Sequence, residues 1–439
     1  MERLKEWVEE SIGAGYEYEV YVEKRHKTII ESSEESLENL IRSEDAGLGI
    51  RVFKDRKMGF SYTTDLREAS VKECVKTAME ICGMTPEDEG FLLGSCENWG
   101  ELRTYYDRMG RERPLEEKIE LVLGMERLAK SLDRRVRGVR KVSLKETEME
   151  VQCFNSCGLF YLYRSTWYNS LIAVLAEEEG DQSISYEFTG SRSLEELPLR
   201  SMVEDAVFKA TATLKPSTFE TRRMPVVLYR DASAMILEAF SPIFLGDSLV
   251  KGKTFLKDRE GERVFSEKLT LVDDGKREGG FLSLPVDAEG YPTDRKALVE
   301  KGRFVGFLHS TYTAVKSGSK PTGNSLRDSF KSLPISGITN LYIEPGELSL
   351  EDLLQEREVL LITDLMGLHT VDPISGDFSL GASGIIYRKG RREKGVRGVV
   401  IGGNIRQLWS SIVEVGNDLK FYGNVGSPSL LVENLTVGG

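Results

Sequence analysis

Residues 231–249 read D-A-S-A-M-I-L-E-A-F-S-P-I-F-L-G-D-S-L and place a carboxylate and a proline in a segment with helical spacing. Glu238 lies opposite the apolar stripe, where we expect it to be exposed or paired at a subunit surface, with substrate contact as the alternative. Pro242 removes the amide that would bond the carbonyl of Glu238 and disfavours helical geometry at Ser241, which predicts a break there. The stripe predicted to pack on a core consists of Ala232, Met235, Ile236, Ala239, Phe240 and Ile243.

Metal chemistry would require grouped histidines or cysteines. The three histidines, His26, His309 and His369, are far apart in sequence, and none has a second His or Cys four or five residues away. A site assembled from His309, His369 and a distant carboxylate such as Asp364 stays open as the basis of an atypical hydrolase.

The five cysteines all lie in the first 157 residues: Cys74, Cys82, Cys96, Cys153 and Cys157. The C-x-x-x-C pair at 153 and 157 has no second pair to complete four zinc ligands. Alternation along a strand would put both thiols on one face, so core packing explains them better. An odd number of cysteines in a chain whose first residues lack an export signal predicts reduced thiols and no disulfide framework.

Other catalytic motifs are incomplete. Residues 246–254, G-D-S-L-V-K-G-K-T, have one residue too many between their glycines for a phosphate-binding loop, and they follow a helix where that motif needs a strand. No G-x-S-x-G nucleophile elbow occurs. The adjacent acids of L-V-D-D-G at 271–275 could do acid/base chemistry, although an Asp-Gly turn is the commoner cause.

Composition narrows the class of protein. The net charge of -12 opposes an extended nucleic-acid surface, because nonspecific affinity for phosphates comes from Lys and Arg. The basic runs at 134–141 and 387–394 are expected to be solvated turns. No apolar run approaches the roughly 20 residues needed to span a bilayer, and the charged first residues do not form a signal peptide, so we predict a cytoplasmic protein.

The elements that would position these residues fall into two halves. Alternating residues 16–30 predict a strand, two apolar runs around the turn at 54–57 predict a hairpin, and Asp65 is expected to cap a helix over about 66–82. The intervening residues 33–47 are expected to interrupt the strands, and 85–113 to connect domains. A helix over 114–132, a long β region with a turn at 155–158, and a helix near 203–210 follow.

The second half begins with a buried strand at 224–228 and continues with the broken helix and then mostly strands and Gly-rich turns. Helices interrupt antiparallel β structure without alternating regularly with it, so the fold class is predicted as α+β. At 439 residues the chain exceeds what one core usually organises. We predict an N-terminal domain with a mixed or antiparallel sheet over residues 1–215 and a β-rich domain over 216–439.

The second half contains a series of short strings in a fixed order. Besides the segment at 231–249 they are L-V-D-D-G at 271, D-A-E-G-Y-P-T at 287, V-G-F-L-H-S-T-Y-T-A at 305, P-T-G-N-S at 321, L-I-T-D-L-M-G at 361, S-G-D-F-S-L-G-A-S-G at 375, I-G-G-N-I at 401, V-G-N-D at 415 and G-S-P-S-L-L-V at 426. Each string alone is weak, but in order and spacing the set resembles the PmbA/TldD family over nearly the whole half. G-L-G-I-R-V-F and G-F-S-Y-T-T-D-L extend the likeness into the first half.

The resemblance implies one of two kinds of subunit in a heterodimeric zinc protease that acts on unfolded peptides. The TldD kind carries H-E-x-x-x-H on a helix and a cysteine ligand near the C terminus, and the PmbA or TldE kind lacks them. Aligned on the trailing L-G-D, the two His positions fall on Leu237 and Pro242, and the Glu falls on Glu238. Leucine and proline offer zinc no lone pair, and no cysteine follows Cys157.

The likeness therefore implies a PmbA/TldE-like, non-catalytic subunit with no cofactor of its own, a TldD-like partner that holds the zinc, and an unfolded peptide as substrate. In isolation the chain is expected to form a homodimer. A self-sufficient hydrolase using His309, His369 and Asp364 is the alternative. A regulator of DNA gyrase that contacts protein and not DNA is a further one, since that role was once attached to the family by name.

Overall fold

The computed structural model describes residues 2–356 and 358–439. The N-terminal half is built on a seven-stranded sheet in the order β3-β2-β1-β5-β6, with β4 and β7 both pairing β6. Only the β4–β6 pair is parallel. The strands are β1 (Glu17–Ser33), β2 (Ser36–Lys54), β3 (Lys57–Thr63), β4 (Asn98–Glu101), β5 (Val136–Asn155), β6 (Phe160–Glu178) and β7 (Asp181–Ser191).

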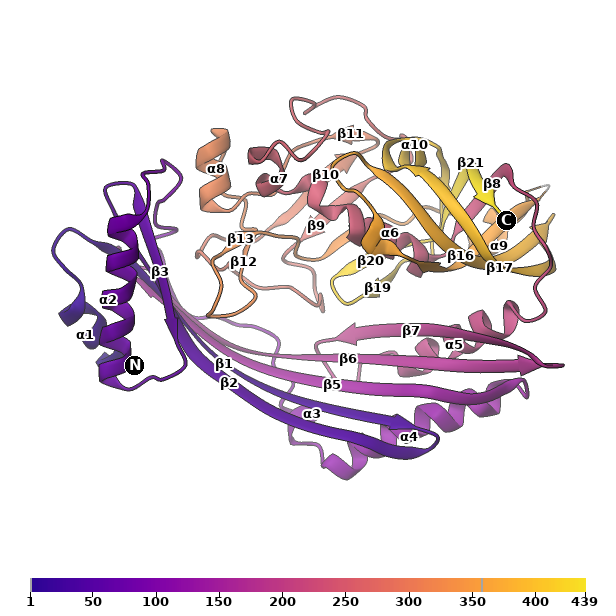
Figure 1. Cartoon of the computed structure of the whole chain (residues 1–439), viewed down its shortest axis with the longest axis horizontal. Helices are drawn as coiled ribbons and strands as arrows, with labels where there is room; N and C mark the ends of the chain where they lie inside the picture. Colours follow the sequence, from indigo (N-terminus) through magenta and orange to yellow (C-terminus); the bar gives the residue numbers. More distant parts are fainter. Residues whose placement is uncertain (1, 357) are drawn as a thin grey trace.

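Helices cover the two ends of this long, curved sheet (Figure 1). At one end α1 (Glu2–Ser11) and α2 (Glu68–Met84) pack on the β2–β3 hairpin with a small core of their own. At the other end α4 (Leu115–Leu132) and α5 (Leu199–Ala212) cover β5 and β6. The short α3 (Arg108–Glu112) precedes α4.

The C-terminal half contains two six-stranded sheets. One has the order β11-β10-β9-β14-β20-β19, and the other has the order β17-β16-β15-β8-β21-β18 with an added β17–β21 pairing that closes five of its strands into a ring. The strands are β8 (Arg222–Leu228), β9 (Leu271–Asp274), β10 (Arg295–Glu300), β11 (Arg303–Phe304), β14 (Leu341–Ile343), β15 (Val359–Met366), β16 (Asp377–Arg388), β17 (Arg391–Asn404), β18 (Ile412–Val415), β19 (Lys420–Tyr422), β20 (Val425–Ser427) and β21 (Leu430–Gly438).

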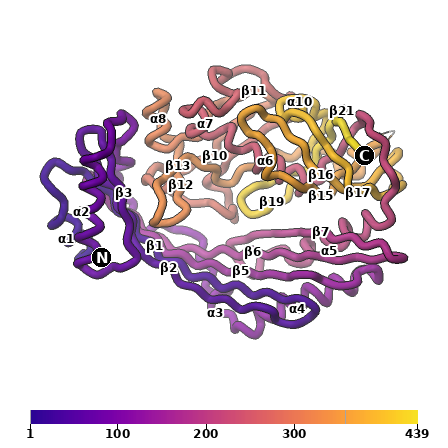
Figure 2. Tube along the Cα trace, viewed as in Figure 1, coloured from indigo at the N-terminus to yellow at the C-terminus, as the bar shows by residue number. Residues whose placement is uncertain are grey.

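The main core of the C-terminal half lies between these sheets and includes the inner face of α6. Figure 2 shows this half folded back over the N-terminal sheet, with residues far apart in sequence side by side. The remaining elements are α6 (Arg230–Phe240), η1 (Ser241–Phe244), α7 (Gly246–Val250), α8 (Thr311–Ser317), β12 (Ser325–Leu326), β13 (Ile335–Ser336), α9 (Leu350–Leu353), η2 (Leu368–Thr370) and α10 (Ile405–Ser410).

A cluster of buried charges joins the two halves beside β1 and β2, and we call it the Arg51 clamp: Glu19, Arg51, Glu289 and Arg327. Arg51 donates to Glu19 at 2.6 and 3.0 Å and to Glu289 at 3.0 Å, and Arg327 also pairs with Glu19. Close approach is possible because β2 carries glycine here: a Cβ on Gly49 would lie 2.2 Å from the Phe330 carbonyl oxygen.

The structure confirms the α+β class, the hairpin around 54–57, the helix over 114–132 and the turn at 155–158. Residues 33–47 do not interrupt the strands, because apart from the turn at 34–35 β1 and β2 pair along this stretch, even though residues 36–45 are all exposed. Asp65 does not occupy the cap position, since α2 begins at Glu68 and its N-cap is Arg67; Asp65 instead accepts the Arg67 amide at 3.1 Å.

The prediction of reduced thiols is wrong for two cysteines. Cys96 and Cys157 form a disulfide, because the turn after β5 brings Cys157 against the segment that contains Cys96. The prediction that Cys153 and Cys157 share a core face therefore holds only for Cys153, which is buried in β5, while Cys157 lies beyond the end of the strand.

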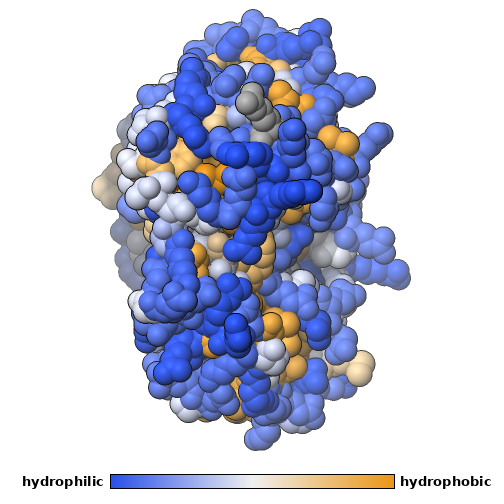
Figure 3. Space-filling view, turned by 90° about the vertical axis from the view of Figure 1, so that its right-hand side faces the viewer, coloured by the Kyte–Doolittle hydropathy of each residue, from blue (hydrophilic) through white to orange (hydrophobic). Residues whose placement is uncertain are grey.

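No helix within residues 2–356 and 358–439 is long and apolar enough to cross a membrane. The end of the molecule at the right of Figure 1 carries a largely hydrophilic surface with apolar side chains in small separate groups (Figure 3).

Candidate functional site

The helix that carries Glu238 is interrupted where the sequence predicts. α6 ends at Phe240, and Ser241–Phe244 continue as the 3-10 turn η1 with Pro242 near its start. Pro242 has no amide to give the Glu238 carbonyl, so that carbonyl accepts the Ser241 backbone N–H and, at 2.8 Å, the Ser241 hydroxyl. Local hydrogen bonds therefore stabilise the break.

The side chains around the break point to different environments. Leu237 and Phe240 are buried in the main core. Glu238 is exposed and makes no ion pair within the described residues, yet the protein mass around it desolvates its carboxyl and raises the pKa. Such a carboxyl holds its proton to a higher pH than an ordinary glutamate.

A cavity of about 630 Å³ lies beside the first turns of α6, between β7 of the N-terminal half and β15 to β17 of the C-terminal half. Its wall contains apolar side chains that reach solvent, because Ile184 is 46%, Tyr186 59% and Met366 57% exposed. Asp231 and Met235 contribute the α6 side of the wall. The cavity is therefore lined by both the edge strand β7 and the helix α6.

A network of charged side chains reaches the wall of this cavity through Glu187, Lys209, Asp231 and Asp364. We call it the Lys209 network: Asp205, Glu187, Lys209, Arg230, Asp231, Asp364 and Lys420. The Lys209 Nζ lies 2.6 Å from Asp231, 2.7 Å from Glu187 and 3.9 Å from Asp364. Lys420 bridges Glu187 at 3.1 Å and Asp205 at 2.7 Å, and Arg230 also binds Asp205 at 2.7 Å. Three cations therefore face four carboxylates.

The pKa values of the network reflect burial and this excess of acid. Burial raises the pKa of Asp231, which Lys209 lowers and Asp364 raises further, and burial likewise raises the pKa of Glu187. For Lys209 burial alone would lower the pKa, but Asp231 and Glu187 outweigh it and the net shift is upward. Lys209 is therefore charged, and protons taken up by the network go to its carboxyls.

Strand β7 has a free edge along the cavity. Within the described residues it pairs only with β6. The Tyr186 carbonyl accepts the Lys209 ammonium at 2.7 Å, and the Gln182 carbonyl accepts Arg397. Since backbone groups of alternate residues face the same edge, the N–H and C=O of Ile184 also point away from β6. Ile184 therefore offers one donor and one acceptor at the wall of the cavity.

The three residues of the alternative hydrolase site have separate environments. His309 is buried, and its Nδ1 lies 3.3 Å from the Thr313 hydroxyl; burial lowers its pKa. His369 is exposed in η2. Asp364 accepts the Ser185 hydroxyl at 3.1 Å. Across residues 2–356 and 358–439 no group of three or more His, Cys, Asp or Glu could hold a metal ion.

Sequence reasoning missed the Lys209 network except for Asp364. The three carboxylates that face the Lys209 ammonium, Glu187, Asp231 and Asp364, lie 22 to 155 positions from it, so no local motif connects them. One signal was available: Lys209 interrupts the apolar face of α5, where Met202, Ala206 and Ala210 are buried. A lysine in such a face requires a buried partner, but the sequence does not say which.

Three stretches of the chain match the domains of one metallopeptidase family. Residues 18–82 match PmbA/TldA metallopeptidase domain 1, residues 110–214 its central domain and residues 221–439 its C-terminal domain. The chain belongs to the PmbA/TldD family. Curated relatives of both kinds cover nearly all of its length.

The relative named Metalloprotease PmbA from Escherichia coli O157:H7 is 28% identical over 428 residues, which are 96% of this chain and 92% of that protein. A Metalloprotease TldD homolog from Haemophilus influenzae is 27% identical over 423 residues, which are 90% of this chain and 87% of that protein. PmbA/TldD sequences of both kinds are thus similar to this chain.

Solved structures share the whole fold. A Thermotoga maritima protein named as a candidate modulator of DNA gyrase superposes with a TM-score of 0.89 at 27% identity and covers 100% of this chain and 99% of its own. TldE from Thermococcus kodakarensis superposes with a TM-score of 0.88 over 100% of both chains, and at 24% identity it shows the fold alone.

Zinc, the metal implied by the resemblance to the PmbA/TldD family, does not fit the residues of this chain at the motif. Zinc takes nitrogen, sulfur or oxygen ligands. Leu237 is buried in an apolar core, Pro242 offers no side-chain lone pair, and the sequence has no cysteine after Cys157. The residues at the two aligned histidine positions therefore cannot hold a zinc ion beside Glu238.

Proposed function

We propose that this chain is a non-catalytic, PmbA/TldE-like subunit that pairs with a TldD-like zinc subunit and helps to enclose an unfolded peptide. The observation that carries the proposal is the replacement of both helix ligands by Leu237 and Pro242, with the break in α6 retained. The metalloprotease names of relatives that span nearly the whole chain support the class of reaction. Hydrolysis itself then belongs to the zinc partner.

The contribution of this subunit is proposed to be peptide binding along β7. An extended peptide can add to a free strand edge through main-chain hydrogen bonds, which place little demand on its sequence. Ile184 offers such an edge, and the exposed side chains of Ile184, Tyr186 and Met366 offer apolar contacts on both sides of it. An unfolded chain exposes both the main chain and the apolar side chains that this wall would take.

The subunit role is tested by purifying the chain alone, the TldD-like subunit alone and the two expressed together. We expect the pair to copurify with zinc in the partner only, and peptide cleavage to appear with the pair and to stop on chelation. Zinc at one equivalent in the isolated chain, with chelator-sensitive cleavage by that chain alone, would replace the proposal by a self-sufficient peptidase.

The binding mode is tested with Ile184→Pro, which removes the outward N–H, and with Ile184→Val as the matched control that keeps it. An outward-facing proline on an edge strand leaves the β6 pairing intact. We expect Ile184→Pro to weaken binding of an unfolded peptide to the isolated chain by about fivefold, because one hydrogen bond contributes about 1 kcal/mol. Equal affinity of both variants would remove β7 from the proposal without affecting the subunit role.

A further inference from the structure

A second cavity lies on the helix-covered face of the N-terminal sheet and is not part of the Lys209 network. It has a volume of about 500 Å³ and lies between β1, β2 and β5 on one side and the start of α4 on the other. Five cationic side chains line it against two carboxylates, Glu44 and Glu146, in a chain whose net charge is -12. The cations are Lys27, Arg42, Arg111, Arg113 and Lys118.

Both carboxylates of the wall already have cationic partners. Glu146 is buried and pairs with Lys118 from α4 and Arg111 from α3. Glu44 pairs with Lys24 at 3.1 Å and lies 3.4 Å from the His26 ring. The wall therefore carries more positive charge than its own acids neutralise.

Arg42 has no acid partner among the described residues, and of the other cations of the wall only Lys27 shares this property. In the part of the chain that the structure describes, no carboxylate lies within ion-pair distance of its guanidinium group, although Arg113, another cation of the wall, is paired with Glu117 at 2.9 Å. Arg42 is exposed, so it needs no partner for stability. Its guanidinium group is therefore available to bind a ligand that enters the cavity.

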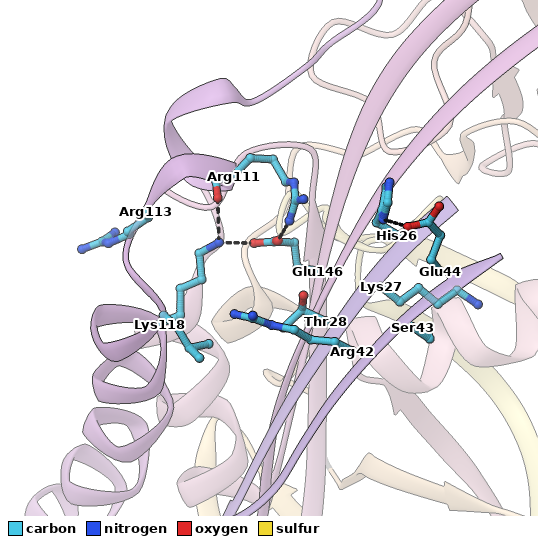
Figure 4. Close-up of a pocket in the computed structure, with 11 residues that line it drawn as sticks. His26, Lys27, Thr28, Arg42, Ser43, Glu44, Arg111, Arg113, Lys118 and Glu146 are labelled. Atoms are coloured by element: carbon cyan, nitrogen blue, oxygen red, sulfur yellow. Dashed lines mark hydrogen bonds and ion pairs between the residues drawn. The ribbon is translucent and has the colours of Figure 1, made fainter. Parts of the chain in front are cut away.

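The pairing of the strands places Arg42 on the same face of the sheet as Thr28 and Glu146. Thr28 pairs in register with Arg42 on one side and with Glu146 on the other, so the three side chains share one face of the sheet. Figure 4 shows the Arg42 guanidinium beside the Thr28 side chain and directed toward the Lys118–Glu146 pair, while the Lys27 side chain points away. A guanidinium, a hydroxyl and an ammonium thus approach one region from three elements.

We infer that this cavity binds a phosphate group. The planar guanidinium of Arg42 matches two phosphate oxygens, and the Thr28 hydroxyl can donate a hydrogen bond. The Lys118 ammonium, which pairs with Glu146, adds a further charged contact. The volume lies in the range of small-molecule sites, and a local positive cavity on an acidic protein concentrates anions. The site is separate from the proposed peptide wall and does not depend on the subunit role.

The test titrates pyrophosphate into the full-length chain by isothermal calorimetry at low salt. Arg42→Gln removes the free guanidinium at an exposed position, and Thr28→Val removes the hydroxyl with little change of shape. Arg391→Gln is the matched control, because Arg391 is also exposed, lies in the β16–β17 hairpin and has no ion pair among the described residues. We expect about tenfold weaker binding for Arg42→Gln, a few-fold loss for Thr28→Val and no change for Arg391→Gln.

The phosphate could belong to a small molecule or to a phosphorylated peptide, and parallel titrations separate the two. Tighter binding of a phosphoserine peptide than of pyrophosphate or ATP, lost in Arg42→Gln, assigns a peptide, and the opposite order assigns a small molecule. Absence of binding by the parent chain at millimolar pyrophosphate overturns the inference. Equal weakening in Arg42→Gln and Arg391→Gln overturns it as well, because net charge alone would then explain the binding.

Discussion

Two buried charge clusters join the halves of this molecule, and their charge balance differs. In the Arg51 clamp two guanidinium groups face two carboxylates, and the pairs are close and almost wholly buried. Burial would raise the pKa of Glu19, but Arg51 and Arg327 outweigh it and lower that pKa. Glu19 therefore stays ionised between its two guanidinium partners, and the clamp connects the two halves through close ion pairs.

The Lys209 network has one carboxylate too many and opens onto a cavity. Burial raises the pKa of both Glu187 and Asp231 in spite of the ammonium between them. Asp364, 23% exposed at its side chain, connects the network to the cavity. A charge-balanced cluster of close ion pairs serves stability, whereas an unbalanced cluster beside an open wall is the pattern expected at a functional site. The Arg51 clamp and the Lys209 network can be distinguished by how much a mutation in each lowers the free energy of unfolding, and by whether that loss depends on pH.

The largest effect is expected at the clamp. Arg51→Met leaves Glu289 without a cation and Glu19 with Arg327 alone, both in a buried site. Removing one partner of a buried pair costs about 3–5 kcal/mol, so we expect a loss of that size in the free energy of unfolding, measured by urea denaturation. The control Arg67→Met breaks an exposed pair with Asp65 and should leave the midpoint unchanged. Equal shifts of the urea midpoint for both variants would show that the buried ion pairs of the clamp contribute no more to the free energy of unfolding than an exposed pair does.

A smaller and pH-dependent effect is expected at the network. Lys209→Met removes the ammonium shared by Asp231 and Glu187, whose pKa values then rise further above their unfolded values. The folded state binds more protons than the unfolded state, so stability falls as pH rises above about 4. We expect a cost of about 3 kcal/mol at pH 8 and clearly less at pH 5. A cost that does not vary with pH would place the network in the same class as the clamp.

Sequence patterns predicted some elements of the fold and missed others. Periodicity identified α4 and the β5–β6 turn because their residues are covered on one side and patterned accordingly. It failed at residues 36–45 of β2, which pair with β1 alone and are exposed throughout, so no alternation marks them as a strand. The disulfide was missed because its two cysteines are 61 residues apart and meet only through the fold.

The candidate site was predictable only where a single residue decides the local backbone. Pro242 interrupts α6 wherever the helix lies, so the break followed from sequence. The Lys209 network draws its carboxylates from β7, α5, α6 and β15, and nothing in the local pattern of these segments says that they converge. Long-range pairing of buried charges is a property of the assembled fold.

A third experiment asks whether the turn that carries Glu289 of the clamp responds to pH. Asp287, in the turn that carries Glu289, is buried and accepts the amides of Glu289, Tyr291 and Ser325. Burial and the neighbouring Glu289 raise its pKa to about 7. Because this pKa lies above the unfolded value, the folded state holds an extra proton between about pH 4 and 7, and stability falls as pH rises through that interval.

In Asp287→Asn the side-chain amide meets the Ser325 amide as donor against donor, which costs about 1–2 kcal/mol at pH 5. The variant has no carboxyl to titrate, so the difference from the parent should narrow toward pH 8. Urea midpoints at both pH values measure it. A difference that widens with pH would show that the folded state does not raise this pKa.

The smallest effect on the free energy of unfolding is expected for a substitution on α6, the helix that carries Asp231 of the Lys209 network. Glu238 is exposed and has no ion pair in the described chain, so Glu238→Gln should change the free energy of unfolding by less than about 0.5 kcal/mol. If the subunit only supports a zinc-bearing partner, the same variant should leave peptide cleavage by the assembled pair unchanged, because Leu237 and Pro242 cannot hold a zinc ion beside this carboxyl. A severalfold drop in peptide cleavage by the pair, with stability and copurification unchanged, would show that Glu238 contacts the substrate. The proposed peptide-binding surface would then extend from the cavity wall to the exposed face of α6.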